Sequence, residues 1–152
     1  MATIAGPRGR WKNDRFFYTG MGLFVVALSV AGFARSYYFA PWFETPAGTP
    51  EITALLHAHA AACTVWLVLM VVQPLLIAGK NRKLHRRLGW FGLAVAFATV
   101  LLGNLAAIAA IHVGFIGLGD PHVFYAVPFF AINSFAVAAF FGFLWRERSE
   151  TH

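Results

Sequence analysis

The sequence predicts an all-α integral membrane protein, a four-helix bundle of up-down-up-down topology with both termini on the cytoplasmic side. Three observations predict it: a surplus of apolar residues, four long apolar stretches, and the placement of lysine and arginine between those stretches. The chain has 152 residues, 59% of them hydrophobic and 12% charged, whereas a soluble domain is about half apolar and about a quarter charged. A water-soluble fold cannot bury such a surplus.

Four stretches of the chain are long enough to cross a bilayer, because a hydrocarbon core about 30 Å thick needs about 20 helical residues. They are residues 16–40, 53–79, 89–113 and 123–145. Each is apolar on all sides rather than on one stripe, which favours lipid around it. The first is too long for the apolar part of a cleaved signal peptide. No linker divides the chain, so residues 1–152 are predicted to form a single transmembrane domain.

The basic residues predict the orientation of these spans. Eleven of the 12 lysines and arginines flank the spans on one side of the predicted membrane: Arg8, Arg10, Lys12, Arg15, Lys80, Arg82, Lys83, Arg86, Arg87, Arg146 and Arg148. The links at about 41–52 and 114–122 have neither residue type, so the positive-inside rule places them outside. The basic residues form no single face interleaved with aromatic side chains, and nucleic acid is not an expected partner.

Four histidines map to the predicted outer ends of the spans: His57, His59, His112 and His122. Antiparallel helices bring them to a similar level, either as independent interfacial residues or as a site. On a regular helix His57 and His59 point about 200° apart, so they do not ligate one ion together unless the helix frays. His59 is the deeper of the two and shares its face with Cys63 and Trp66.

A haem site is one interpretation of this arrangement. The run from His57 to Cys63 has little side-chain bulk, which permits close helix packing or the approach of a flat macrocycle. Histidines on two helices can supply both axial ligands of a haem. The expected ligands are His59 and His122, with His57 and His112 as substitutes.

Arg35, near the outer end of the first span, has two interpretations. It either snorkels to the outer headgroups or binds an anionic group such as a haem propionate. A zinc or copper site is the competing assignment for the outer polar residues. Its ligands would come from His57, His112, His122, Glu51 and Asp120.

Three amide side chains lie deeper in the spans: Gln73, Asn104 and Asn133. Interhelical hydrogen bonding is their expected role, and lining a quinone or proton path is the alternative. The chain has no HExxH, CxxC or nucleotide-binding glycine motif, so no enzymatic activity is assigned from motifs.

The segment HAHAAACTVWLVLMVVQPLLIAGKNRKLHRRLGW, residues 57–90, resembles a group of small bacterial four-span membrane proteins. The shared features are HxH, the following tryptophan, a glutamine near the end of the span, and LHRRLG. The resemblance covers about residues 15–115 and includes AGFARSYYFAP at the end of the first span. It implies a multi-pass protein of the bacterial inner membrane and brings no established activity.

More distantly, the bundle is similar to transmembrane b-type cytochromes, which pass electrons to ferric iron or quinone. That similarity implies haem b and a membrane redox complex or quinone as partner. Such cytochromes usually hold one haem near each face, with ligands well inside the helices. Here the inner-side candidate is only His85, which lies in the charged link and not in a span, so a single outer-side haem is expected. Two functions therefore remain open: a haem b electron-transfer protein, or a non-catalytic subunit or assembly factor of a respiratory or other membrane complex.

Overall fold

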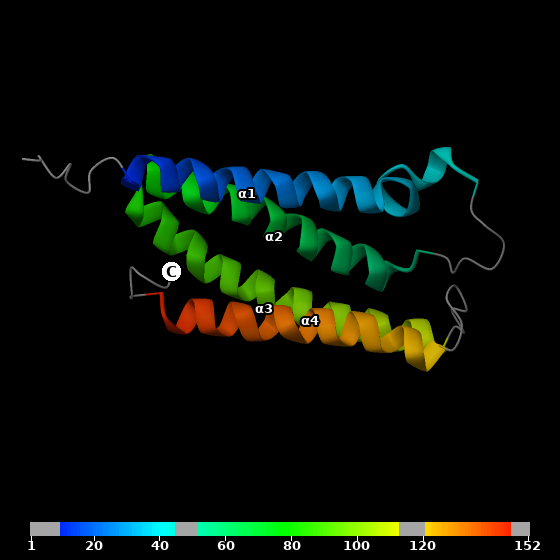
Figure 1. The fold of residues 1–152 in the computed structure, drawn as a ribbon. Coiled ribbons are helices and arrows are strands. Elements are labelled where there is room, and N and C mark those ends of the chain that lie inside the picture. Colours follow the sequence, from blue (N-terminus) through cyan, green and yellow to red (C-terminus); the bar gives the residue numbers. More distant parts are fainter. Residues whose placement is uncertain (1–9, 45–51, 113–120, 147–152) are drawn as a thin grey trace, which may run out of the picture. The chain divides into compact units, whose positions relative to one another are not determined.

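The computed structural model describes residues 10–44, 52–112 and 121–146, with side chains described for 17–44, 52–112, 123 and 125–146. This part of the chain is helical and contains no strand, which confirms the predicted all-α class (Figure 1). Its elements are α1 (Arg10–Phe33), the π-helical turn η1 (Ala34–Tyr38), the 3-10 turn η2 (Ala40–Trp42), α2 (Ala54–Ala78), α3 (Arg82–His112) and α4 (Pro121–Leu144).

Within the residues that the structure describes, four helical segments have the length and hydropathy of membrane spans: Phe17–Tyr38, Ala54–Ala78, Arg82–His112 and Tyr125–Leu144. Large apolar side chains on them are exposed, as at Phe97 (69%) and Val127 (69%). This pattern is typical of helices that face lipid, because a soluble protein rarely exposes contiguous apolar surface of this extent. The second span agrees closely with the predicted residues 53–79.

The third helix begins earlier than expected, at Arg82 instead of residue 89. Lysine and arginine are good helix formers, so the basic segment continues the helix although its charge excludes it from an apolar stretch. The predicted link therefore shrinks to a tight turn around Lys80.

That turn ends α2 and begins α3. Asn81 N–H donates to the Leu76 carbonyl (2.8 Å) and Lys80 N–H to the Ile77 carbonyl (3.1 Å), the two bonds of a Schellman motif. Lys80 has φ 58°, the left-handed conformation that glycine usually supplies at this position. Asn81 also caps α3, because its side-chain oxygen accepts from Leu84 N–H (3.2 Å).

The chain forms two compact units. The first contains Met1–Phe43 and Leu67–Trp90, and the second contains Glu44–Trp66 and Phe91–His152. Helices α2 and α3 pass through both units. Along these two helices, His59 of α2 lies by Gly103 of α3 and Gln73 lies by Gly89, so α2 and α3 are antiparallel.

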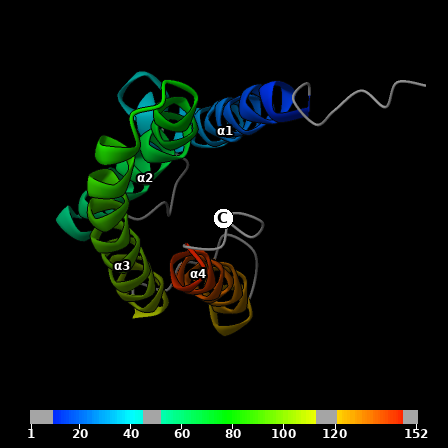
Figure 2. The same cartoon turned by 90° about the vertical axis from the view of Figure 1, so that its left-hand side faces the viewer.

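In the first unit, α1 packs against the second half of α2 (Figures 1 and 2). Pro74 has no N–H, so the Met70 carbonyl lacks its usual partner within the helix. A Cβ at Gly22 would lie 3.0 Å from this Met70 oxygen and 3.4 Å from Val71 Cγ2. Glycine at position 22 thus lets the α1 backbone approach the free carbonyl, where Cα–H···O contacts are available.

In the second unit, the buried residues of α3 lie along one face and are mostly small: Gly92, Val95, Ala96, Thr99, Gly103 and Ala107. Helix α4 meets this face, since a Cβ at Gly103 would lie 3.0 Å from Ile132 Cδ1. On the α2 side, Trp66 packs edge-to-face on Phe135 of α4 with ring centroids 5.0 Å apart. The small residues on the buried face of α3 let the helix backbones come close together.

We expect Gly22→Ala to destabilise the protein, because its Cβ would press on a backbone oxygen that cannot rotate away. Overpacking of this kind typically costs about 1–3 kcal/mol. Gly20→Ala is the matched control, since nothing lies within 4 Å of a Cβ there. Thermal unfolding in detergent would measure the difference, and equal midpoints for the two variants would contradict the close contact.

Candidate functional site

The centre of the candidate site is His59, a half-buried residue of α2 in the second unit that lies against α3. Its ring occupies the space that a side chain at Gly103 of α3 would fill, because a Cβ there would be 2.8 Å from His59 Cε1 and 3.3 Å from Nδ1. Any side chain at position 103 would therefore displace the imidazole. The ring also lies close to the backbone of Thr99, one helical turn before Gly103.

The chain's one cysteine, Cys63, lies beside this ring. Its Sγ lies 3.5 Å from His59 Nε2 and 3.9 Å from Nδ1. The two residues are one turn apart on α2, which places them on one face of the helix. The predicted common face of His59 and Cys63 is thereby confirmed, and Trp66 continues it to the ring contact with Phe135.

Thr99 faces the same region from α3. Only 8% of the residue is exposed, and its Oγ1 has no hydrogen-bond partner among the described residues. Threonine within a helix commonly donates to the carbonyl of the preceding turn, so an unpaired hydroxyl beside a histidine is unusual. It leaves one polar group available close to His59.

A pair of amides forms a second polar contact in this unit. Asn133 Nδ2 lies 3.5 Å from Asn104 Oδ1, at the outer limit of a hydrogen bond, and 2.7 Å from the Phe129 carbonyl. Asn104 Nδ2 donates to the Val100 carbonyl (2.9 Å). Both side chains are thus anchored to their own helix and meet across the α3–α4 contact, as expected for residues that join helices.

The third predicted amide lies in the first unit. Gln73 Oε1 is buried with no hydrogen-bond partner in the described part of the chain. Its Nε2 points toward α3, where a Cβ at Gly89 would lie 4.0 Å away. The carbonyl oxygen therefore keeps an open acceptor position.

The remaining candidate residues are less closely grouped. His57 and His112 are exposed. Arg35 is exposed on η1, with its guanidinium carbon 5.6 Å from the Phe43 ring centroid in a cation–π arrangement. Glu51, Asp120 and the His122 side chain lie outside the described residues. Within the described residues, no group of three or more histidine, cysteine, aspartate or glutamate side chains is placed to hold a metal ion.

Helix register separates the histidines in depth. His59 lies opposite Gly103, and His112 is nine residues farther along α3, about 14 Å at 1.5 Å per residue. On α4, position 122 precedes Ile132, the Gly103 neighbour, by about 15 Å of helix. Histidines on opposite sides of one iron need similar depths. The described side chains therefore offer His59 as one axial ligand, and its pairing with His122 stays a prediction.

Two residues of this site were not predicted from the sequence: Gly103 and Thr99. Glycine in the interior of a helix costs about 1 kcal/mol relative to alanine, so Gly103 within the third apolar stretch is itself a signal of close approach. No comparable pattern marks Thr99, because its role depends on which α3 face meets His59.

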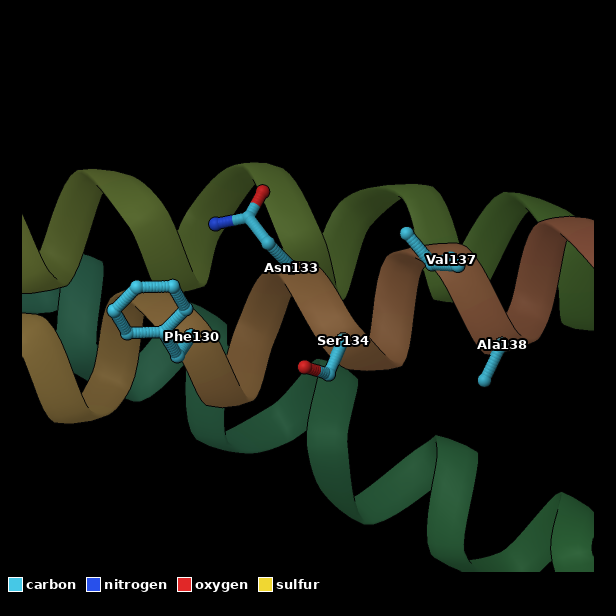
Figure 3. Close-up of a pocket in the computed structure, with 5 residues that line it drawn as sticks. All are labelled: Phe130, Asn133, Ser134, Val137 and Ala138. Carbon is cyan, nitrogen blue, oxygen red and sulfur yellow. The ribbon is translucent and has the colours of Figure 1, made fainter.

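A groove of about 410 Å³ follows one face of α4 (Figure 3). It is lined by Phe130, Asn133, Ser134, Val137 and Ala138. Ser134 and Ala138 are exposed, and the next residue at the same spacing, Gly142, has nothing within 4 Å of a Cβ. The stripe Ser134, Ala138 and Gly142 is of the small-residue type that transmembrane helices use for close packing.

Comparison with known proteins identifies no relative: no family model, curated protein or solved structure matches the chain. The candidate site therefore has to be interpreted from its own chemistry.

We expect Gly103→Ala to destabilise the protein, because the added methyl group would force the His59 ring away from α3. In a His59→Ala background the same substitution should cost much less, because the atoms it would strike are gone. Contacting residues commonly show coupling energies of about 0.5–3 kcal/mol. A double-mutant cycle on thermal unfolding in detergent measures the coupling, with Gly142→Ala as the open-site control. Additive effects would contradict the contact.

Proposed function

We propose that the protein is a non-catalytic helical subunit of a membrane complex. The observation that carries this proposal is the state of His59, which packs against Gly103 and lies close to the backbone of Thr99. A histidine engaged in this way joins helices, as Asn104 and Asn133 do. Polar contacts between transmembrane helices contribute about 0.6–2 kcal/mol each, which suits a structural role.

The exposed face of α4 supports a partner for this subunit. Ser134 places a hydroxyl on an otherwise apolar surface, beside the exposed small residues Ala138 and Gly142. A hydroxyl in hydrocarbon is better satisfied beside another helix, and small residues allow that helix to come close. The partner class is therefore another transmembrane helix of the same complex.

The proposal includes the location and orientation of the chain. The protein is a multi-pass component of the bacterial inner membrane with both termini in the cytoplasm. The exposed basic residues Lys80, Arg82, Lys83, Arg86 and Arg87 support this orientation, because cytoplasmic links are enriched in lysine and arginine. Four apolar helices supply the spans.

A haem b electron-transfer protein is the second candidate, and one observation favours it. His59 is a half-buried imidazole inside a span, bordered by a glycine. The nearby Thr99 backbone would orient the ring, as partners of ligating histidines do. The described residues supply no second histidine at its depth on another helix, and His57 points away from His59 on α2. They therefore fit haem at one axial position only, and we derive no redox step from them.

Orientation is tested by cysteine labelling in a Cys63→Ser background. Glu44→Cys should react with an impermeant maleimide added to spheroplasts, because residue 44 follows the outer end of the first span. Asn81→Cys should react only after the membrane is opened. The reverse labelling pattern would overturn the proposed orientation.

The two candidate functions predict different absorption spectra. Purified from haem-replete cells in detergent, the subunit should show no Soret band, before or after reduction with dithionite. A haem b protein should show sharp reduced bands that disappear in His59→Ala. Reduced bands that depend on His59 would reject the non-catalytic proposal.

A further inference from the structure

We infer that His59 and Cys63 form a binding site for one soft monovalent metal cation, Cu(I). The site goes beyond the proposed subunit function and does not depend on it. Three observations carry it: the separation of the two ligand atoms, the charge that the surroundings tolerate, and the polar groups that face the pair from α3.

The ligand atoms already have a suitable spacing. Cys63 Sγ and His59 Nε2 are 3.5 Å apart. Metal–sulfur and metal–nitrogen bonds of about 2.3 and 2.0 Å span about 3.5 Å at a tetrahedral angle and about 4.3 Å in a straight line. A metal ion between the two atoms therefore needs only a small rotation of the side chains. Because both residues lie on adjacent turns of α2, their spacing depends on that one helix.

Charge selects the metal. The pair lies inside an apolar span, where an unbalanced charge is costly. On binding, the thiol loses its proton to solvent and a sulfur–metal bond forms, while the imidazole stays neutral. One thiolate balances one positive charge, so a Cu(I) complex is neutral overall. Zn²⁺ would leave an excess positive charge, and no third histidine, cysteine, aspartate or glutamate ligand joins the pair among the described residues.

The softness of the sulfur ligand also favours Cu(I), because thiolates bind Cu(I) in preference to hard cations. The same coordination suits Ag(I), which has the same charge and does not change oxidation state under ordinary conditions. Ag(I) is therefore a redox-stable probe of the site.

The facing helix supports ligation by His59. Its imidazole lies close to the Thr99 backbone, and a partner at one ring nitrogen leaves the other lone pair for a metal. Thr99 is also more than nine-tenths buried, with an Oγ1 that has no hydrogen-bond partner among the described residues. This hydroxyl on α3 is a polar group that a weak third ligand or a bound water would satisfy. Gly103, on the same face of α3, leaves the space that the ring needs.

The test uses the full chain in detergent, purified without a polyhistidine tag. Cu(I), supplied anaerobically, competes with a chromophoric Cu(I) chelator, and Ag(I) is titrated in parallel. We expect one equivalent of either ion to bind, with release of one proton. Cys63→Ser and His59→Ala should each weaken binding by more than about 100-fold, since loss of outer-shell partners alone costs about 10–100-fold. His85→Ala is the histidine control and should bind like the parent protein.

Three results would overturn the site. They are failure of Cu(I) or Ag(I) to compete with the chelator, binding by Cys63→Ser as tight as binding by the parent, and binding of Zn²⁺ tighter than that of Cu(I). Circular dichroism of each variant checks that the helices are intact. X-ray absorption of the Cu(I) form provides a second measurement, with one sulfur and one nitrogen neighbour expected and a spectrum without sulfur contradicting the assignment.

Discussion

Helix packing in this protein depends on two glycines whose missing side chains let a neighbouring helix come close. In the first unit, Gly22 meets the Met70 carbonyl that Pro74 leaves free. In the second, Gly103 admits the His59 ring into the face of α3. Helices in lipid associate without a hydrophobic force between them, so in that setting close contacts of this kind and a few polar bonds supply most of the association. The positions of the amides and of the candidate site follow from them.

The sequence was sufficient for the helices and insufficient for their register. Hydropathy predicted α2 within a residue at each end, because an apolar stretch bounded by polar residues has well-defined limits. It missed the start of α3 at Arg82, since charged residues that are good helix formers extend a helix past its apolar part. The π-helical turn at Ala34–Tyr38 has no comparable sequence signal.

The candidate site shows the same limit at the level of side chains. The common face of His59 and Cys63 could be predicted, because it depends on the periodicity of one helix. The neighbours of that face, Thr99 and Gly103, belong to another helix and depend on how the two are paired. Depth along a helix can be counted from the sequence, whereas the partner at that depth is decided by packing. Polar residues in the apolar stretches therefore indicate where a site lies better than they indicate what the site binds.

The turn around Lys80 also bears on how this chain tolerates changes in length. Asn81 completes the Schellman motif of α2 with its N–H and caps α3 with its side chain. Surface links commonly accept insertions because their backbone makes few obligatory bonds. Here one added residue would break the end of one span and the beginning of the next together. Related chains of varying length are therefore expected to differ in the other links and to conserve the length of the turn around Lys80.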